Sequence, residues 1–375
     1  MKRFLSLITL LVLALSGQAQ QYYLLVGTYT TGTSKGIYVY RFDASTGKTT
    51  PVGETDVENP SYLTFSPDGR FVYAVNENPS GTGGVTALSF DTLTGNLHLL
   101  NRQSSEGEFP CYVATDATGK WITVANYGGG NLSAYRVADD GSLGGSAQLI
   151  QHEGKGANAK RQEKPHVHST VFTPDQRYVV SADLGLDKVY VYNFNPDMDE
   201  PLTPASTPTV SVRPGSGPRH IAFSPDHRYM YLITELSGEV HVFGYAKGRF
   251  TPIEHVPTVL KDTSADKGSA DLHLSPDGRF LYASDRGNTN DIVVFEVHPG
   301  SGKLKRVGSV SCGGVTPRNF TIDPTGHFLL VANQRSDNVV IFKRDMQTGL
   351  LTPTGDQLQI GNPVCLKWWP VPSAH

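Results

Sequence analysis

The amino-acid sequence predicts an all-β fold, a seven-bladed β-propeller, and three observations support this prediction. A segment made of a turn and a strand recurs with a period of about 50 residues, which is the length of one propeller blade. The 375 residues include 17 Tyr and 16 Phe, which favour strands, and 39 Gly and 24 Pro, which favour turns. The two ends of the chain carry complementary parts of one more copy.

Six complete copies of the repeat place a turn of the Pro-Asp-Gly type before a strand rich in aromatic and β-branched residues. In the first copy this segment is Ser66–Glu77, with the sequence SPDGRFVYAVNE. The second residue of each copy gives steps of 50, 57, 51, 51 and 48 residues between Pro67, Ala117, Pro174, Pro225, Pro276 and Pro324. Further strands follow the copies, for example at Val85–Phe90, Val189–Phe194, Val240–Tyr245 and Ile292–Val297.

The ends of the chain supply the seventh blade. Tyr22–Tyr29 matches the strand that ends at Glu77, and Asn362–Pro370 matches Asn59–Pro67, the strand before the turn. The chain therefore begins with the second strand of a blade and ends with the first strand of the same blade. Pairing of the C-terminal strand with the N-terminal blade closes the ring and leaves no open sheet edge there. We expect residues 20–375 to form a single domain.

Residues 1–19 are typical of a secretory signal peptide. Lys2 and Arg3 precede an apolar stretch from Phe4 to Leu15, and Gly17-Gln18-Ala19 supplies small residues at the expected cleavage site. The stretch is short for a membrane span, and nothing later approaches ~18 consecutive apolar residues. We expect an exported protein, periplasmic or secreted, with no membrane anchor after cleavage.

Composition argues against a nucleic-acid partner, a disordered or coiled-coil protein and a disulfide framework. The 32 Lys+Arg and 35 Asp+Glu give a net charge of −3, so no basic surplus exists to bind nucleic acid. Charged residues make up 18% of the chain, too few for a charge-rich disordered protein or a coiled coil. Cys111, Cys312 and Cys365 are odd in number and widely spaced, so no disulfide framework is indicated. The sequence gives no indication of the oligomeric state.

Equivalent positions of the blades meet at one mouth of the central channel, where each innermost strand begins and each second strand ends. The innermost strands begin at Ser61, Cys111, His168, Arg219, Ala270, Arg318 and Val364. The second strands end at Tyr29, Glu77, Tyr127, Leu184, Glu235, Arg286 and Gln334. The residues just before these ends are expected to brace the site, namely Asn76, Asn126, Asp183, Asp285 and Asn333.

This gathering of ionisable groups predicts a functional site. The candidate catalytic residues are His168, Glu235, Arg219 and Arg286. The candidate substrate-binding residues are His166, His220, Arg318, Arg161, Glu77, Tyr127 and Gln334. His166 and His168 lie two apart, so an extended strand would point them the same way.

Arginines gathered in one cavity form a receptor for phosphate or carboxylate. A neighbouring histidine or glutamate can take a proton from water, and an arginine can stabilise the resulting oxyanion. This combination suits hydrolysis of an acidic lactone without a covalent intermediate. Glu235 beside cations should stay ionised and be a weak base unless it is desolvated. His168 or His166, with an ordinary pKa near 6.5, therefore competes for the role of the base, which stays open.

Other motifs indicate less. His166 and His168, with Glu235 or Asp183, could ligate a metal, but the adjacent arginines oppose a bound cation, so no metal and no cofactor is expected. Gly32–Gly36 spells the nucleophile-elbow motif G-x-S-x-G, yet it lies in an expected hairpin loop rather than between a strand and a helix. A non-enzymatic propeller that binds a protein or glycan, and a metal-dependent sugar lactonase, remain as alternatives.

From about Tyr23 to Trp369 the chain resembles the seven-bladed β-propeller lactonase family, which includes bacterial 6-phosphogluconolactonases and fungal carboxy-cis,cis-muconate cyclases. The segments that carry this resemblance are Gly27-Thr-Tyr-Thr30, Asn59-Pro-Ser-Tyr62, Ala125-Asn-Tyr127, Arg161-Gln162, Pro165-His-Val-His168, Asp183-Leu-Gly-Leu-Asp187, Gly217-Pro-Arg-His220, Thr234-Glu-Leu236, Asp285-Arg-Gly287, Pro317-Arg-Asn-Phe320 and Ala332-Asn-Gln334.

The resemblance implies a carboxylic-ester hydrolase of the 6-phosphogluconolactonase type that acts on a small anionic lactone. It places the family's proposed active-site residues, a His, two Arg and a Glu, at His168 (or His166), Arg219, Arg286 and Glu235. The polar loop 152–164 makes the long step of 57 residues, and its Arg161 and Gln162 are expected to reach the substrate as part of a lid. The export signal departs from the cytosolic setting of sugar-phosphate metabolism, so the substrate could be another sugar lactone or acid.

Overall fold

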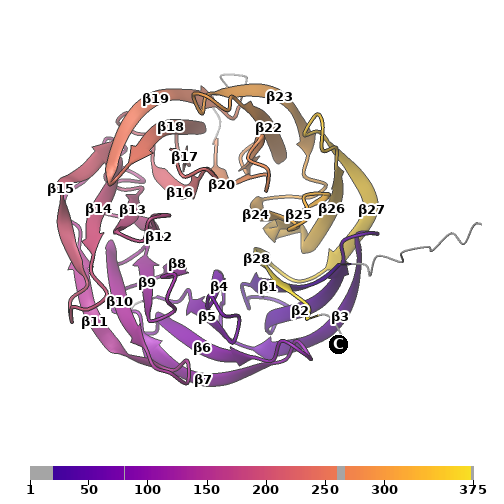
Figure 1. The fold of residues 1–375 in the computed structure, drawn as a ribbon, viewed down its shortest axis with the longest axis horizontal. Helices are drawn as coiled ribbons and strands as arrows, with labels where there is room; N and C mark the ends of the chain where they lie inside the picture. The colour runs from indigo at the N-terminus through magenta and orange to yellow at the C-terminus, as the bar shows by residue number, and fades with distance from the viewer. Residues whose placement is uncertain (1–19, 80, 260–266, 373–375) are drawn as a thin grey trace, which may run out of the picture.

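The computed structural model describes residues 20–79, 81–259 and 267–372. These residues form seven four-stranded antiparallel sheets that stand as blades around a central axis (Figure 1). The predicted seven-bladed, all-β propeller is therefore confirmed. The expected signal peptide, residues 1–19, lies outside the described residues.

Each blade runs from an innermost strand to an outermost one, and we give the strands in that order. The closing blade contains β28 (Pro363–Pro370), β1 (Gln21–Thr28), β2 (Gly36–Asp43) and β3 (Lys48–Asp56). The next blade contains β4 (Leu63–Phe65), β5 (Phe71–Asn76), β6 (Gly84–Phe90) and β7 (Leu97–Ser104). The third contains β8 (Pro110–Thr115), β9 (Trp121–Asn126), β10 (Asn131–Val137) and β11 (Leu143–Gln151). The fourth contains β12 (Val167–Phe172), β13 (Tyr178–Asp183), β14 (Lys188–Phe194) and β15 (Leu202–Ser211).

The remaining three blades follow the same order. The fifth contains β16 (Pro218–Phe223), β17 (Tyr229–Thr234), β18 (Glu239–Ala246) and β19 (Arg249–Pro257). The sixth contains β20 (Ser269–Leu274), β21 (Phe280–Asp285), β22 (Asp291–Val297) and β23 (Leu304–Ser311). The seventh contains β24 (Pro317–Ile322), β25 (Phe328–Asn333), β26 (Asn338–Arg344) and β27 (Leu351–Gln359), with a single 3₁₀ turn, η1 (Gln334–Ser336). Among the described residues no helix is long and apolar enough to cross a membrane.

The two ends of the chain close the ring as predicted. β1 pairs antiparallel with β28, with Leu24 opposite Trp368 and Val26 opposite Leu366. Figure 1 shows this junction as the contact between the indigo and yellow strands. Because the closing blade combines both ends of the chain, the ring has no unpaired inner edge at the junction.

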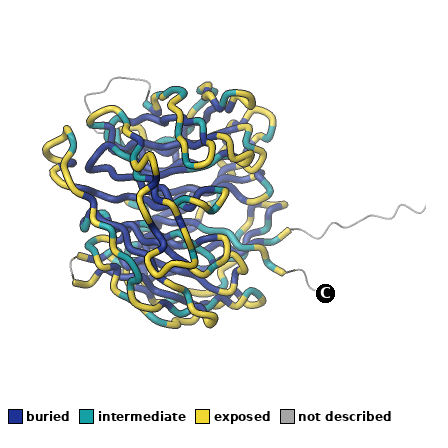
Figure 2. The backbone as a smooth tube through the Cα atoms, turned by 60° about the vertical axis from the view of Figure 1, so that its left-hand side comes forward, coloured by how far each residue is buried: buried dark blue, intermediate teal, exposed yellow. Residues whose placement is uncertain are grey.

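The core lies between neighbouring blades. Second strands such as β5 are buried along their whole length, whereas outermost strands such as β7 expose most of their residues. Figure 2 shows exposed segments on the outside of the molecule and buried ones inside it. The tyrosine that recurs in these second strands also ties the blades together. Tyr73 is fully buried, and its hydroxyl donates to the carbonyl of Gly141 in the next blade at 3.2 Å. Gly141 has a φ of +83°, and a Cβ there would meet the ring of Phe71 at 2.1 Å, so this turn requires glycine.

Six of the seven innermost strands, all except β4, contain a β-bulge that positions site residues. Between β8 and β9 the ladder passes from Pro110 directly to Tyr112, so Cys111 has no partner. Similar bulges leave out His168, Arg219, Arg318 and Val364. On β20 the ladder omits both Ala270 and Asp271. A bulge re-aims the side chain of its extra residue, and these are the positions that the repeat places at the start of the innermost strands.

Candidate active site

A small cavity lies where the innermost strands begin. The cavity is lined by Ser61, Tyr62, Glu77, Cys111, His168, Arg219, His220, Arg318 and Val364. Six of the seven residues that start the innermost strands are therefore in its wall. The free space in the whole cavity is about 10 Å³, enough for about one water molecule, so a larger ligand must lie above it. We call these nine residues, together with Arg161, Glu235 and Arg286, the mouth.

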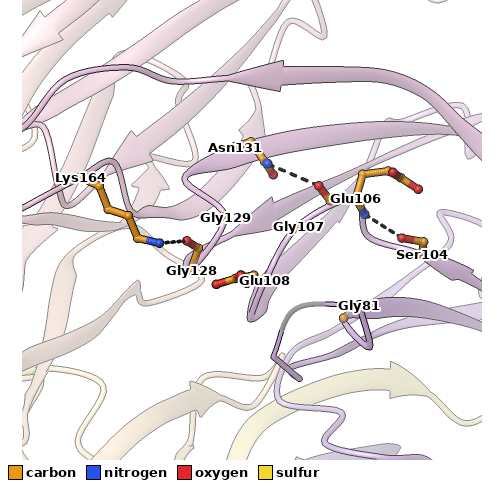
Figure 3. A pocket seen from close by; sticks show the side chains of 10 residues that line it. Gly81, Ser104, Glu106, Gly107, Glu108, Gly128, Gly129, Asn131 and Lys164 are labelled. Carbon is orange, nitrogen blue, oxygen red and sulfur yellow. Dashed lines mark hydrogen bonds between the residues drawn. The ribbon is translucent and has the colours of Figure 1, made fainter.

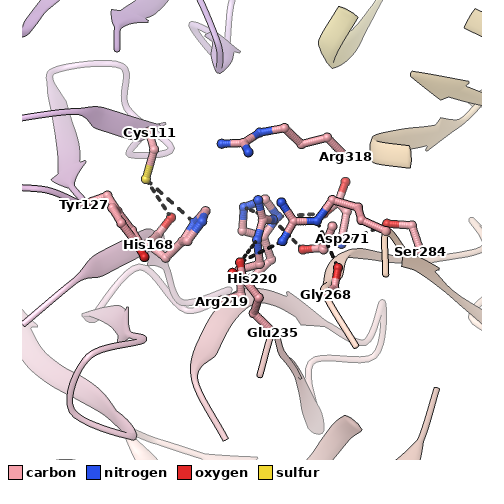
Figure 4. A network of polar contacts seen from close by, with 12 residues as sticks. Cys111, Tyr127, His168, Arg219, His220, Glu235, Gly268, Asp271, Ser284 and Arg318 are labelled. Atoms are coloured by element: carbon pink, nitrogen blue, oxygen red, sulfur yellow. Dashed lines mark hydrogen bonds and ion pairs between the residues drawn. The ribbon is translucent and has the colours of Figure 1, made fainter. Parts of the chain in front are cut away.

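Glu235 is the centre of an arginine cluster in the mouth (Figure 4). Its Oε2 lies 3.1 Å from Nε of Arg219 and 2.8 Å from an Nη of Arg286. Its Oε1 lies 2.6 Å from an Nη of Arg161, which reaches in from the loop 152–164. Burial favours protonation, but Arg286, Arg219, His168 and Arg161 together hold the pKa of Glu235 well below its usual range. Glu235 is thus a carboxylate with both oxygens occupied by arginines.

His168 faces the same cavity and has few partners. Its Nδ1 lies 3.7 Å from the sulfur of Cys111, and its ring meets the rings of Tyr127 and His220 edge-on at 5.4 and 5.3 Å between centroids. Its Nε2 makes no hydrogen bond with any residue that the structure describes. Burial lowers the pKa of His168 well below its usual value, and Arg219 lowers it further. His168 is therefore neutral at pH 7 and able to accept a proton.

Cys111 stays a thiol in this position, because burial raises its pKa and outweighs the arginines nearby. All three cysteines are buried and unbridged, in line with the absence of a predicted disulfide framework.

His220 uses both ring nitrogens within the protein. Its Nε2 lies 3.2 Å from an Nη of Arg219, and its Nδ1 lies 2.8 Å from Oδ1 of Asp271. Burial and Arg219 lower the pKa of His220 to about 4, so the ring is neutral and can accept the hydrogen bond from the guanidinium. Oδ2 of Asp271 accepts from His273 at 3.0 Å and from Asn319. Asp271 therefore fixes the ring of His220, and His220 in turn orients the guanidinium of Arg219.

Asp271 is absent from the residues singled out in the sequence. It lies one position after Ala270, as His220 lies one position after Arg219 in the previous blade. A comparison of the blades at this next position would have found it. Its carboxylate is buried, and although burial favours protonation, His273 and His220 hold its pKa well below the usual range.

A second ion pair lies across the cavity from Glu235. An Nη of Arg318 is 3.7 Å from Oε1 of Glu77, and the guanidinium lies over the ring of Tyr29 at 5.3 Å. Glu77 also accepts a hydrogen bond from the hydroxyl of Ser61. Burial opposes the charge on Arg318, but Tyr29 and Glu77 raise its pKa overall.

The other predicted binding residues lie at or beyond the edge of the cavity. The ring of His166 stacks on Tyr127 at 4.5 Å and hydrogen-bonds the carbonyl of Tyr127 at 3.0 Å and Glu163 at 3.1 Å. Its two nitrogens are thus occupied outside the cavity wall. Gln334 begins η1 and is not among the residues that line the cavity.

The loop 152–164 is fixed to the blade beneath it. Gln162 is completely buried and donates to the carbonyl of Leu184 at 2.7 Å and to Asp187 at 2.8 Å. The expectation that Gln162 reaches the substrate is therefore wrong, because its amide is used to anchor the loop. Arg161 is the side chain of the loop that enters the mouth.

Of the residues expected to brace the site, Asp183 contacts a predicted site residue, His166, whereas Asn126 hydrogen-bonds outside the site. Asn126 donates to the carbonyl of Ser105 at 2.8 Å, and Asp183 accepts from the backbone N–H of His166 at 2.9 Å and from His152 at 2.7 Å. Ser34 of the G-x-S-x-G sequence lies in the hairpin loop between β1 and β2, as expected, and hydrogen-bonds Thr28.

A larger hollow of about 420 Å³ lies outside the mouth (Figure 3). Its wall is formed by the segments around Glu106, Glu108 and Gly128, with Lys164 at one side. Lys164 donates to the carbonyl of Gly128 at 2.6 Å. This hollow gathers no histidine and no arginine, so the residues suited to hydrolysis lie in the mouth instead. Among the described residues, no three His, Cys, Asp or Glu side chains are placed to hold a metal ion.

Comparison with known proteins identifies the family. Residues 23–368 match the sequence model of the family described as "Lactonase, 7-bladed beta-propeller". The chain belongs to this lactonase family. The 6-phosphogluconolactonase of Bacillus subtilis (strain 168) is 40% identical over 347 residues, which cover 92% of this chain and 97% of that protein.

Solved structures of the lactonase family show the same similarity. The crystal structure of a putative 6-phosphogluconolactonase from Bacteroides fragilis NCTC 9343 is 42% identical with a TM-score of 0.90, covering 94% of this chain and 99% of that one. The periplasmic gluconolactonase of Pseudomonas aeruginosa is 40% identical with a TM-score of 0.90, covering 94% and 100%.

Proposed function

We propose that this protein hydrolyses a sugar lactone of the 6-phosphogluconolactone type to the open hydroxy acid, using activated water and no covalent intermediate. Membership of the lactonase family and the 6-phosphogluconolactonase relatives support this activity. The observation that carries the proposal is the mouth itself, where the neutral His168 faces the cluster of Glu235 and its arginines.

His168 is the better candidate for the general base. Its Nε2 has no partner among the described residues, so it can take a proton from a water molecule as that water attacks the lactone carbonyl. Glu235 would have to give up contacts with Arg161, Arg219 and Arg286 to act in the same way. We therefore assign Glu235 to positioning these arginines.

Arg219 and Arg286 are placed to stabilise the oxyanion that forms at the carbonyl. Arg219 is held by Glu235, by the carbonyl of Ala270 at 2.5 Å and by His220, so its guanidinium needs no reorganisation when charge develops. The tetrahedral intermediate then expels the ring oxygen, which takes the proton that His168 removed from water and becomes the hydroxyl group of the product, leaving His168 neutral again.

The test is hydrolysis of freshly prepared 6-phosphogluconolactone and gluconolactone by the pure mature protein, measured against spontaneous ring opening. We expect acceleration with at least one substrate and a large loss in Arg219→Ala. No acceleration with either lactone, with a correctly folded protein, would refute the proposal.

We also propose that the protein is exported. The basic and apolar pattern of residues 1–19 supports this, as does the similarity to the periplasmic gluconolactonase of Pseudomonas aeruginosa. Cell fractionation with N-terminal sequencing should find a mature chain that begins near Gln20 outside the cytoplasm. A full-length chain confined to the cytoplasm would contradict this.

A further inference from the structure

The four arginines of the mouth differ in how fully their donors are used. Arg219 donates to Glu235, to the carbonyl of Ala270 and to His220. Arg286 donates from Nε to the carbonyl of Gly268 at 2.9 Å and pairs with Glu235 through an Nη. Both guanidiniums are therefore fixed to the protein.

Arg318 is different, because it makes no hydrogen bond with any residue in the described parts of the chain. Its one ion pair, to Glu77, is long at 3.7 Å, and its other contact is with the face of Tyr29. The side chain lies in the cavity wall and is 19% exposed. A guanidinium carries five N–H donors, so Arg318 presents an unused set of donors to the cavity.

Glu77 and Tyr29 hold Arg318 in this position, but they accept no hydrogen bond from its N–H donors. Glu77 is 13% exposed and is fixed by the hydroxyl of Ser61, so it supplies charge at a distance. In Figure 4 the guanidinium of Arg318 extends into the centre of the channel, on the side opposite Glu235 and Arg219. A planar, fixed guanidinium suits two-point binding of a carboxylate or phosphate.

We infer that Arg318 is the receptor for an anionic substituent of the lactone, a phosphate or a carboxylate, and that it sets a preference for charged over uncharged lactones. This inference rests on the proposed lactonase function. The substrate would then lie above the cavity, with its carbonyl facing His168 and Arg219 and its anionic end on Arg318. The four arginines outnumber Glu77, Glu235 and the nearby Asp271, so the site keeps a positive charge for such a ligand.

The neighbouring hollow is a poorer place for the anionic group. Glu106 and Glu108 in its wall would repel a phosphate, and Lys164 there already donates to the carbonyl of Gly128. The observations therefore favour Arg318 over Lys164 as the anion receptor.

The test compares three substrates: 6-phosphogluconolactone, a lactone that carries a free carboxylate, and uncharged gluconolactone. Arg318→Met should lower kcat/KM for the two charged lactones about 10- to 100-fold, the loss expected for one charge-assisted interaction. It should change kcat/KM for gluconolactone by less than about threefold. Arg318→Lys should recover more of the rate on the phosphorylated lactone than on the lactone that carries a carboxylate. Lysine keeps the positive charge but lacks the paired N–H donors of a guanidinium.

An equal loss of kcat/KM on all three substrates would place Arg318 in the catalytic machinery and overturn the inference. No loss of kcat/KM on either charged lactone would overturn it as well. Calorimetric binding of inorganic phosphate gives a readout that does not need activity: the native protein should bind it and Arg318→Met should not. Failure of every lactone as a substrate, with phosphate binding that depends on Arg318, would refute the proposed function and leave the receptor intact.

Two variants control for folding. Arg213 forms another arginine–glutamate pair, outside the cavity and 2.6 Å from Glu239, and Arg213→Met should leave all three rates unchanged. If Arg318→Met fails to fold because Glu77 loses its partner, the double variant Glu77→Gln/Arg318→Met removes that charge and carries the same prediction.

Discussion

The two sides of the mouth carry the same residue types at the same blade positions, yet they differ in how these residues pair. Arg219 and Glu235 belong to one blade, where the start of the innermost strand lies beside the end of the second strand, and they pair at 3.1 Å. Glu77 has Ser61 in the place of that arginine, and the arginine nearest to it, Arg318, comes from another blade at 3.7 Å. Glu235 also pairs at 2.8 Å with Arg286 of the next blade, so it holds its arginines by short contacts, whereas the long pair of Arg318 with Glu77 leaves the donors of Arg318 free for a ligand.

The largest effect should come from the base. His168→Asn should lower kcat on every lactone by roughly 100- to 10,000-fold, while the melting temperature changes little, because His220, the other histidine that lines the cavity in the described structure, has both ring nitrogens occupied. In the native protein the rate should fall only at a pH well below 6.5, since the pKa of His168 is lowered. A pH–rate profile checks this. If His168→Asn retained most of the rate, His168 would not be the general base, and Glu235 would become the candidate.

Glu235→Gln should come next, because it leaves three arginines without their common carboxylate. We expect a loss of about 3–5 kcal/mol in the free energy of unfolding at pH 7, the usual cost of removing one partner of a buried ion pair. Urea denaturation measures it, and Glu77→Gln, with one distant arginine, is the matched control and should lose less. Equal losses in the two variants would contradict the difference between the two sides.

The depressed pKa of Glu235 also predicts a pH dependence. Its pKa is lower in the folded state than in the unfolded state, so its contribution is present above the ordinary glutamate value and is lost as the pH falls through the folded pKa. Glu235→Gln should therefore flatten acid denaturation below about pH 4.3.

His220 should give a smaller, separate effect at a higher pH. Burial and Arg219 lower its pKa from 6.5 to about 4, so the unfolded chain binds a proton that the folded chain does not between these values. Stability should fall as the pH drops through this window, and His220→Asn should reduce that slope when unfolding is measured at pH 7 and pH 5. An unchanged slope would show that His220 is not held neutral.

The smallest effect should come from Arg161, whose side chain is 39% exposed at the edge of the mouth. Arg161→Gln should raise KM by about two- to fivefold with little change in melting temperature, because exposed ion pairs contribute little. Steady-state kinetics checks this. A loss as large as that of Arg219→Ala would place Arg161 in the catalytic cluster.

Part of the site could be predicted from the repeats alone. Alignment of the copies placed His168, Arg219 and Arg318 at one position and Glu77 and Glu235 at another, and the structure brings all five together. The same alignment stopped one residue short of Asp271, and it placed Gln334 at the same position as Glu77, which lines the cavity although Gln334 does not.

The sequence by itself determined the seven-bladed ring, its closure by β1 and β28, and the set of charged residues at the mouth, because a repeat of about 50 residues repeats the path of the backbone as well. Only the tertiary structure decided which charges are paired. The support of His220 by Asp271 and the unused donors of Arg318 depend on distances between side chains of different blades, and the anchoring of Gln162 depends on how the loop 152–164 packs against the turn after β13. Such distances depend on bulges and rotamers that are set when the blades pack, and the period of the sequence contains no information about them.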